Sequence, residues 1–103
     1  MALLYITEYS NAAQSDGVPI QAGQEPALVY QTPVVIGAGS LQSALFNAGT
    51  RFVRVHADVI CSVAFGASPT AVAQTQNRMA ANQTEFFGVP PGGAHRLAVI
   101  AST

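Results

Sequence analysis

The sequence predicts an all-β protein, a single antiparallel β-sandwich that spans residues 1–103. Turn-forming stretches such as Asp16-Gly17, Ala48-Gly49 and residues 90–93 recur so often that little room is left for a helix of ordinary length. Short runs rich in valine, isoleucine, phenylalanine and tyrosine lie between these turns, at a spacing typical of sandwiches and small barrels. A chain of 103 residues fits one domain with one hydrophobic core.

Strands are expected at six places along the chain. They are residues 3–7 (LLYIT), 27–31 (ALVYQ), 34–36 (VVI), 51–65, 84–89 (TEFFGV) and 96–101 (RLAVIA). The N-terminal segment 1–25 is expected to supply an edge strand followed by a loop or arm, because residues 10–25 are small and polar. Residues 70–83 contain alanine, glutamine and methionine, which permit helix, but we assign them mostly to loop and irregular strand.

The longest apolar run, residues 51–65, alternates in a way that separates its reactive side chains. In a continuous strand the odd-numbered residues from Val53 to Phe65 share a dry face, and the wet face carries Arg54, His56, Asp58 and Ser62. A bend near Ala57-Asp58 also fits, since the run is long for one strand. In a single strand Cys61 cannot meet His56, so Cys61 is expected to pack in the core.

The sequence offers few residues for catalysis or metal binding. A three-ligand metal site would require His56, Asp58 and His95 to converge, although His95 stands far along the chain beside a Gly-Gly turn. No GxSxG motif frames a serine for a Ser/His/Asp triad. We therefore expect no catalytic residue, no metal and no cofactor, and a protein that is not an enzyme.

The stretch VVIGAGSLQSALF (34–46) is similar to the glycine-rich turn of a dinucleotide site. Gln42 stands where the third glycine is required, and a helix from Leu41 would end at Ala48-Gly49, which is short for a crossover. The remaining chain lacks the alternating helices of a parallel sheet. Gly37 and Gly39 are therefore expected to turn the chain between two strands.

Charge is scarce in this sequence. Only 9% of residues are charged, lysine is absent, and the net charge is -1. Nucleic acids and anionic membranes are bound through clustered lysine and arginine, so neither is an expected partner. The apolar run in MALLYITEYS is too short for a signal peptide and no run has transmembrane length, which predicts synthesis inside the cell.

Three C-terminal stretches carry a resemblance to a known family. CSVAFGASPTA (61–71), RMAANQTEFFGVPPGG (78–93) and RLAVIA (96–101) resemble small β-sandwich proteins of tailed-bacteriophage heads, the capsid decoration or cement proteins. The resemblance implies a jelly-roll-like sandwich on the outer capsid surface, made in the host cytoplasm, that clamps subunits of the major capsid protein. Residues 1–50 match only loosely, and no site residue carries over.

Candidate protein-interface residues are apolar or aromatic and lie in segments expected to be outside the core: Leu3, Leu4, Tyr5, Tyr9 and Met79. Alternatively, Leu4 and Ile6 simply begin an edge strand. Both interpretations hold if that strand pairs with a second copy, because LLYIT has no charge or proline before Glu8 to guard an open edge. Self-association as a homodimer is favoured, with a homotrimer as the alternative.

Two other functions stay open. The protein could be a head-tail or tail component of a virion. It could also be a carbohydrate-binding β-sandwich module, since jelly rolls host lectins. Such modules present exposed aromatic side chains, and this chain has no tryptophan and three tyrosines.

Overall fold

The computed structural model describes residues 2–75 and 77–103, and within these residues the chain forms eleven strands and no helix. The strands are β1 (Leu3–Tyr9), β2 (Ala12–Ser15), β3 (Val18–Gly23), β4 (Val29–Tyr30), β5 (Val34–Val35), β6 (Leu41–Gln42), β7 (Phe52–Ala57), β8 (Cys61–Gly66), β9 (Arg78–Met79), β10 (Thr84–Gly88) and β11 (Arg96–Ala101). The predicted all-β class is confirmed. Nowhere in the described residues does a helix arise that could span a bilayer.

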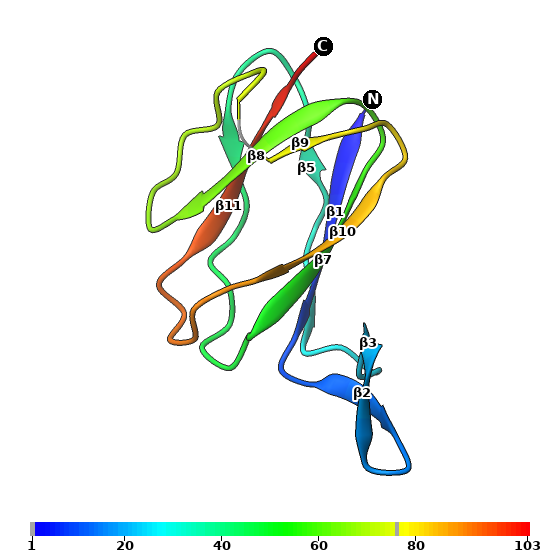
Figure 1. Ribbon diagram of the computed structural model, residues 1–103. Helices are drawn as coiled ribbons and strands as arrows, with labels where there is room; N and C mark the ends of the chain where they lie inside the picture. The colour runs from blue at the N-terminus through cyan, green and yellow to red at the C-terminus, as the bar shows by residue number, and fades with distance from the viewer. Residues whose placement is uncertain (1, 76) are drawn as a thin grey trace.

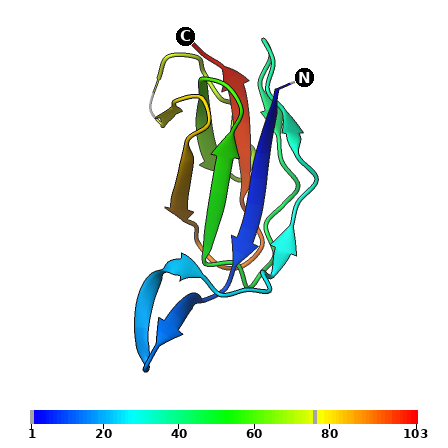
Figure 2. The same ribbon diagram turned by 90° about the vertical axis from the view of Figure 1, so that its right-hand side faces the viewer.

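Two antiparallel sheets face each other (Figures 1 and 2). The first has the order β10-β7-β1-β4, with β5 also paired to β1. The second has the order β6-β11-β8-β9. Alternation along the strands turns one side of each sheet inward, and these two sides form the core. The buried core contains Leu4, Ile6, Val53, Val55, Ala57, Cys61, Val63, Leu97 and Val99, together with Ile36, Phe46, Met79 and Val89. The predicted antiparallel sandwich is confirmed.

The run 51–65 is not one strand. It breaks between Ala57 and Cys61, so that β7 lies in the first sheet and β8 in the second. The predicted dry face is correct at Val53, Val55, Cys61 and Val63, which are all buried, and wrong at Val59, which is exposed in the break between the two strands.

Ser62 was predicted on a wet face and this prediction is wrong, because Ser62 is buried. The connection from β8 to β9 folds back over the outer side of the second sheet. It is held there by the Ala71 N–H, which donates to Ser40 Oγ at 2.9 Å, and by the Gln74 N–H, which donates to Ser102 Oγ at 3.0 Å. This connection excludes solvent from Ser62, which the alternation pattern had placed on a solvent-exposed face.

The glycine-rich stretch joins two strands, as predicted. β5 precedes Gly37 and pairs with β1 in the first sheet, whereas β6 follows Gly39 and pairs with β11 in the second. Gly37 and Gly39 therefore lie where the chain crosses from one sheet to the other.

The N-terminal strand is not an edge strand, which corrects the prediction for residues 3–7. β1 pairs with β7 over most of its length, with Tyr5 opposite His56, and on its other side it pairs with β4 and β5. Residues 29–35 occupy the side of β1 that the sequence left unassigned. LLYIT therefore has no free edge for a second copy.

Residues 12–23 form a projecting β-hairpin, where a loop or arm was expected. β2 and β3 pair with each other only, and Asp16 and Gly17 close the turn with φ values of 54° and 79°. Two consecutive residues with positive φ are the requirement of a type I′ hairpin turn, which explains the Asp-Gly pair. The hairpin hangs from one end of the sandwich in Figures 1 and 2, and the molecule measures 44 × 26 × 22 Å. We call residues 12–23 the arm.

Candidate functional site

The outer face of the first sheet collects aromatic side chains. Because Leu4, Ile6, Val53 and Val55 point inward, the residues between them point outward. Three exposed rings come from three different strands, at 40% exposure for Tyr5 on β1, 63% for Tyr30 on β4 and 47% for Phe86 on β10. We call this side of the sheet the aromatic face.

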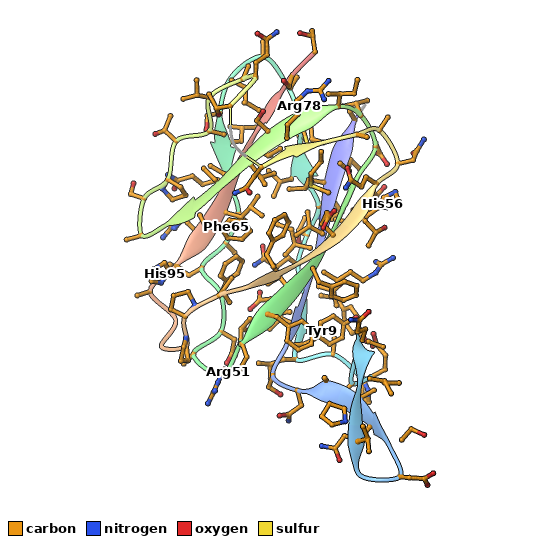
Figure 3. The ribbon with its side chains drawn as sticks, in the orientation of Figure 1. Tyr9, Arg51, His56, Phe65, Arg78 and His95 are labelled. Atoms are coloured by element: carbon orange, nitrogen blue, oxygen red, sulfur yellow. The ribbon has the colours of Figure 1, made fainter. Side chains whose placement is uncertain are left out.

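Ring contacts continue across the strands of this face. Tyr9 stacks on Phe52 with centroids 5.2 Å apart, and Phe52 meets Phe86 at 6.2 Å. Tyr5 lies 6.2 Å from the His56 ring further up the sheet. Figure 3 shows Tyr9 near the base of the arm and His56 towards the other end of the strands. The rings on this face thus form two groups, Tyr9 with Phe52 and Phe86 near the arm, and Tyr5 with His56 further along the strands.

The base of the arm is fixed to this face by Glu25. Its Oε2 accepts a hydrogen bond from the Tyr9 hydroxyl, and its Oε1 accepts one from the Tyr30 hydroxyl, both at 2.6 Å. The Ala27 N–H also donates to Oε1, at 3.1 Å. Gly23 lies directly against the Tyr9 ring, where any Cβ would overlap the ring atoms. The arm therefore leaves the sandwich in a defined direction.

These hydrogen bonds shift the titration of both partners. Donation from Tyr30 and then from Tyr9 lowers the pKa of Glu25 below its usual value, and Arg54 adds to the effect. Burial, followed by the hydrogen bond to Glu25, raises the pKa of Tyr9 to about 12. At neutral pH the base of the arm thus holds a carboxylate bound by two neutral phenols.

A notch opens between the arm and the aromatic face. Its walls come from the arm on one side and from β7 and β10 on the other, and it measures about 480 Å³. The lining residues used below are Ile20, Ala22, Phe52, Phe86 and Gly88. Ile20 and Phe86 remain 45% and 47% exposed although they line it, so the notch is open to solvent. We call this feature the arm notch.

Glu8 is a buried carboxylate that the sequence reasoning did not single out. The Thr50 hydroxyl and the Asn47 N–H donate to its Oε1, and Gln31 Nε2 donates to its Oε2, all three at 2.7 Å. The sequence did contain a signal for this burial. Leu4, Ile6 and Glu8 are spaced two residues apart along β1, so their side chains point to the same, inward side of the sheet. Two of its three donors come from the turn before β7 and the third from Gln31 after β4, so Glu8 joins β1 to both of these segments.

The predicted interface residues separate into two groups. Tyr5 lies on the exposed aromatic face, and Leu3 is half-buried beside Val35. Leu4 and Met79 are core residues with 0% and 1% exposure, and Tyr9 is 4% exposed in the base of the arm. The last three side chains are not available to a partner, because Leu4 and Met79 pack in the core between the sheets and the base of the arm covers Tyr9.

The sequence candidates for chemistry do not form a site. His56 Nδ1 lies 2.8 Å from Thr84 Oγ1, while Asp58 Oδ2 accepts a hydrogen bond from the Leu3 N–H at 3.0 Å. The His95 carbonyl binds the Phe46 N–H elsewhere in the fold. Among the described residues no three His, Cys, Asp or Glu side chains gather as metal ligands do. Cys61 is fully buried, and burial raises its pKa to about 11.

The arrangement supports recognition by surface contact. The aromatic face and the arm notch place apolar area beside a few polar groups, while the carboxylates of Glu8 and Glu25 are engaged in bonds that hold the fold. Comparisons with protein-family models, curated proteins and solved structures find no match. The functional argument therefore depends on the geometry of this face.

Proposed function

We propose that the protein is a non-enzymatic virion structural protein that decorates and stabilises a capsid by binding subunits of the major capsid protein from outside. The observation that carries the proposal is the aromatic face with the arm beside it. This surface offers exposed rings from three strands, Tyr5, Tyr30 and Phe86, and a projecting hairpin that extends the reach of a small domain. Aromatic side chains are enriched, and charged ones depleted, at the centres of protein interfaces.

The low charge supports the same proposal. With 9% charged residues, attraction to a partner has to come mainly from apolar burial, which contributes about 25 cal/mol per Å² and is weakened little by moderate salt. A protein that remains on a particle through changes of ionic strength needs this kind of contact. The resemblance of residues 51–101 to phage-head proteins is the reason for proposing the major capsid protein as the partner, and self-association as a homodimer belongs to the same proposal.

A carbohydrate-binding module is the second candidate, and one observation favours it. Tyr5, Tyr30 and Phe86 stand exposed on one face, which is how sugar rings are commonly stacked in β-sandwich modules. A glycan array would distinguish the two candidates. Binding to a glycan class with no binding to assembled shells would replace the capsid proposal.

Co-sedimentation with assembled shells tests the proposal directly. Purified protein should pellet with shells, should remain bound in roughly half-molar salt, and should not pellet with purified tails. Tyr5→Ser on the aromatic face should weaken binding, whereas Val72→Ser should not. Val72 is a matched control because it is 58% exposed and lies in the connection that covers the other sheet. Equal loss from both variants, or pelleting with tails alone, would contradict the proposal.

A further inference from the structure

The arm lacks the packing that a two-stranded hairpin needs. Every residue from Val18 to Ala22 is exposed, and β2 and β3 hydrogen-bond only to each other. An isolated two-stranded hairpin is marginally stable in water, and it gains stability by packing an apolar side against another surface. Val18 and Ile20, 61% and 45% exposed, lie on the same side of β3 because residues alternate along a strand.

The same side of the arm faces a surface that is also uncovered. Ile20 and Ala22 form one wall of the arm notch, and Phe52 and Phe86 belong to the other. β10 is the outer strand of the first sheet, and a Cβ built on Gly88 would meet nothing within 4 Å. The notch can therefore receive a thin, extended, apolar segment, which is what the arm itself is.

Charge indicates that the segment belongs to a second copy. Asp16 lies at the exposed tip of the arm, whereas Arg54 acts electrostatically on Tyr9 and Glu25 at the base. If two arms cross antiparallel with Ile20 opposite Ile20, the tip residue Asp16 of one copy comes opposite Gln24 at the base of the other arm. On this side of the sheet Arg54 pairs with Phe86, which lines the notch. The oxygens of the neighbouring Glu25 already accept bonds from two hydroxyls and one N–H, so the guanidinium of Arg54 is the cation that would attract the carboxylate of Asp16.

We propose that the arm notch is a self-association site whose occupant is the arm of a second copy of this chain, in a two-fold dimer with Ile20 at its centre. Each arm covers the notch of the other, so the contact is isologous and closed. This inference deepens the self-association contained in the proposed function and rests on it. It replaces pairing through β1, which the interior position of that strand prevents.

Cysteine cross-linking of the purified protein tests the proposal. Ile20→Cys should form a disulfide-linked dimer under mild oxidation, because the two-fold axis brings the two Ile20 positions together. Val72→Cys is the matched control, since Val72 is also exposed, at 58% against 45% for Ile20, but lies in the connection between β8 and β9, away from the arm. Cys61 does not interfere, because it is fully buried. Cross-linking of both variants at the same rate would overturn the proposal.

Sedimentation velocity supplies a second, independent measurement. The native protein should dimerise below about 1 mM, Ile20→Asp should weaken the dimer by about tenfold or more, and Val72→Asp should leave it unchanged. Arg54→Asp should also weaken it, and adding Asp16→Lys should restore it. A native monomer, or no recovery in the double variant, would refute this interface. Shell binding by a monomeric protein would refute this inference alone, whereas a dimer that ignores shells would refute the capsid function alone.

Discussion

Replacing Glu8 by alanine should remove the largest single polar contribution to the stability of this fold. Glu8 is 1% exposed, and its carboxylate receives three hydrogen bonds of 2.7 Å from the side chains of Thr50 and Gln31 and from the backbone of Asn47. Glu8→Ala leaves these donors without their acceptor at the centre of the first sheet. The loss is therefore greater than that of one hydrogen bond.

The expected size follows from the number of donors and their burial. Losing one hydrogen bond to a charged group costs about 1.5–3 kcal/mol, and unsatisfied buried donors add to this. We expect Glu8→Ala to lower the free energy of unfolding by about 3–5 kcal/mol. Thr50→Val, which deletes one of the three bonds with little change of shape, should cost about 1.5–3 kcal/mol. The total stability of a domain is about 5–15 kcal/mol, so Glu8→Ala should be close to unfolding.

Urea denaturation followed by circular dichroism measures these differences. Glu85→Ala is the matched control, because Glu85 is half-buried and accepts one side-chain bond, from Gln83 at 2.6 Å. Because Glu85 is partly exposed, water can replace this bond, and its loss should cost about 1 kcal/mol or less, below the cost expected for buried Glu8. Thermal melting should agree, with Glu8→Ala at least about 12 °C below the native protein. If Glu8→Ala and Glu85→Ala lower the free energy of unfolding by the same small amount, Glu8 does not hold the neighbouring segments together as described.

Three further outcomes test the arm and the core. Gly23→Ala should destabilise the base of the arm by about 1–3 kcal/mol, because the new Cβ overlaps the Tyr9 ring, and denaturation against the neutral control Gly88→Ala measures it. Since the pKa of Tyr9 is raised from 10 to about 12, its stabilising effect is complete below pH 10 and is lost between pH 10 and about 12; tyrosinate absorbance should show this late step and Tyr9→Phe should abolish it. With its pKa raised to about 11 and no exposure, Cys61 should react slowly with thiol reagents until urea unfolds the protein, so rapid native labelling would contradict the burial.

Strand alternation and turn chemistry were sufficient to predict the core. Val53, Val55, Cys61 and Val63 point inward as the period of two requires, and Asp16-Gly17 forms the predicted turn, although the hairpin that it closes was not predicted. The turn between two strands at Gly37 and Gly39 was also predicted, although the passage from one sheet to the other was not. These features depend on residues close together in the sequence.

Pairing between distant segments could not be predicted in the same way. β1 became interior because residues 29–35 returned to its free side, and Ser62 became buried because the connection from β8 to β9 covers its sheet. Both facts depend on which segments meet in space, and alternation within one strand carries no such information. The aromatic face has the same origin, since Tyr5, Tyr30 and Phe86 are brought together only by the strand order.

The most direct test of the capsid function is an electron-microscopy difference map between shells with the protein bound and shells without it. We expect additional density on the outer surface, with the aromatic face of β1, β7 and β10 directed towards the shell or towards a second copy. The outer side of the second sheet, which carries the exposed Val72, should face solvent. Absence of density, or density in which the second sheet contacts the shell while the aromatic face and the arm stay free, would contradict the account.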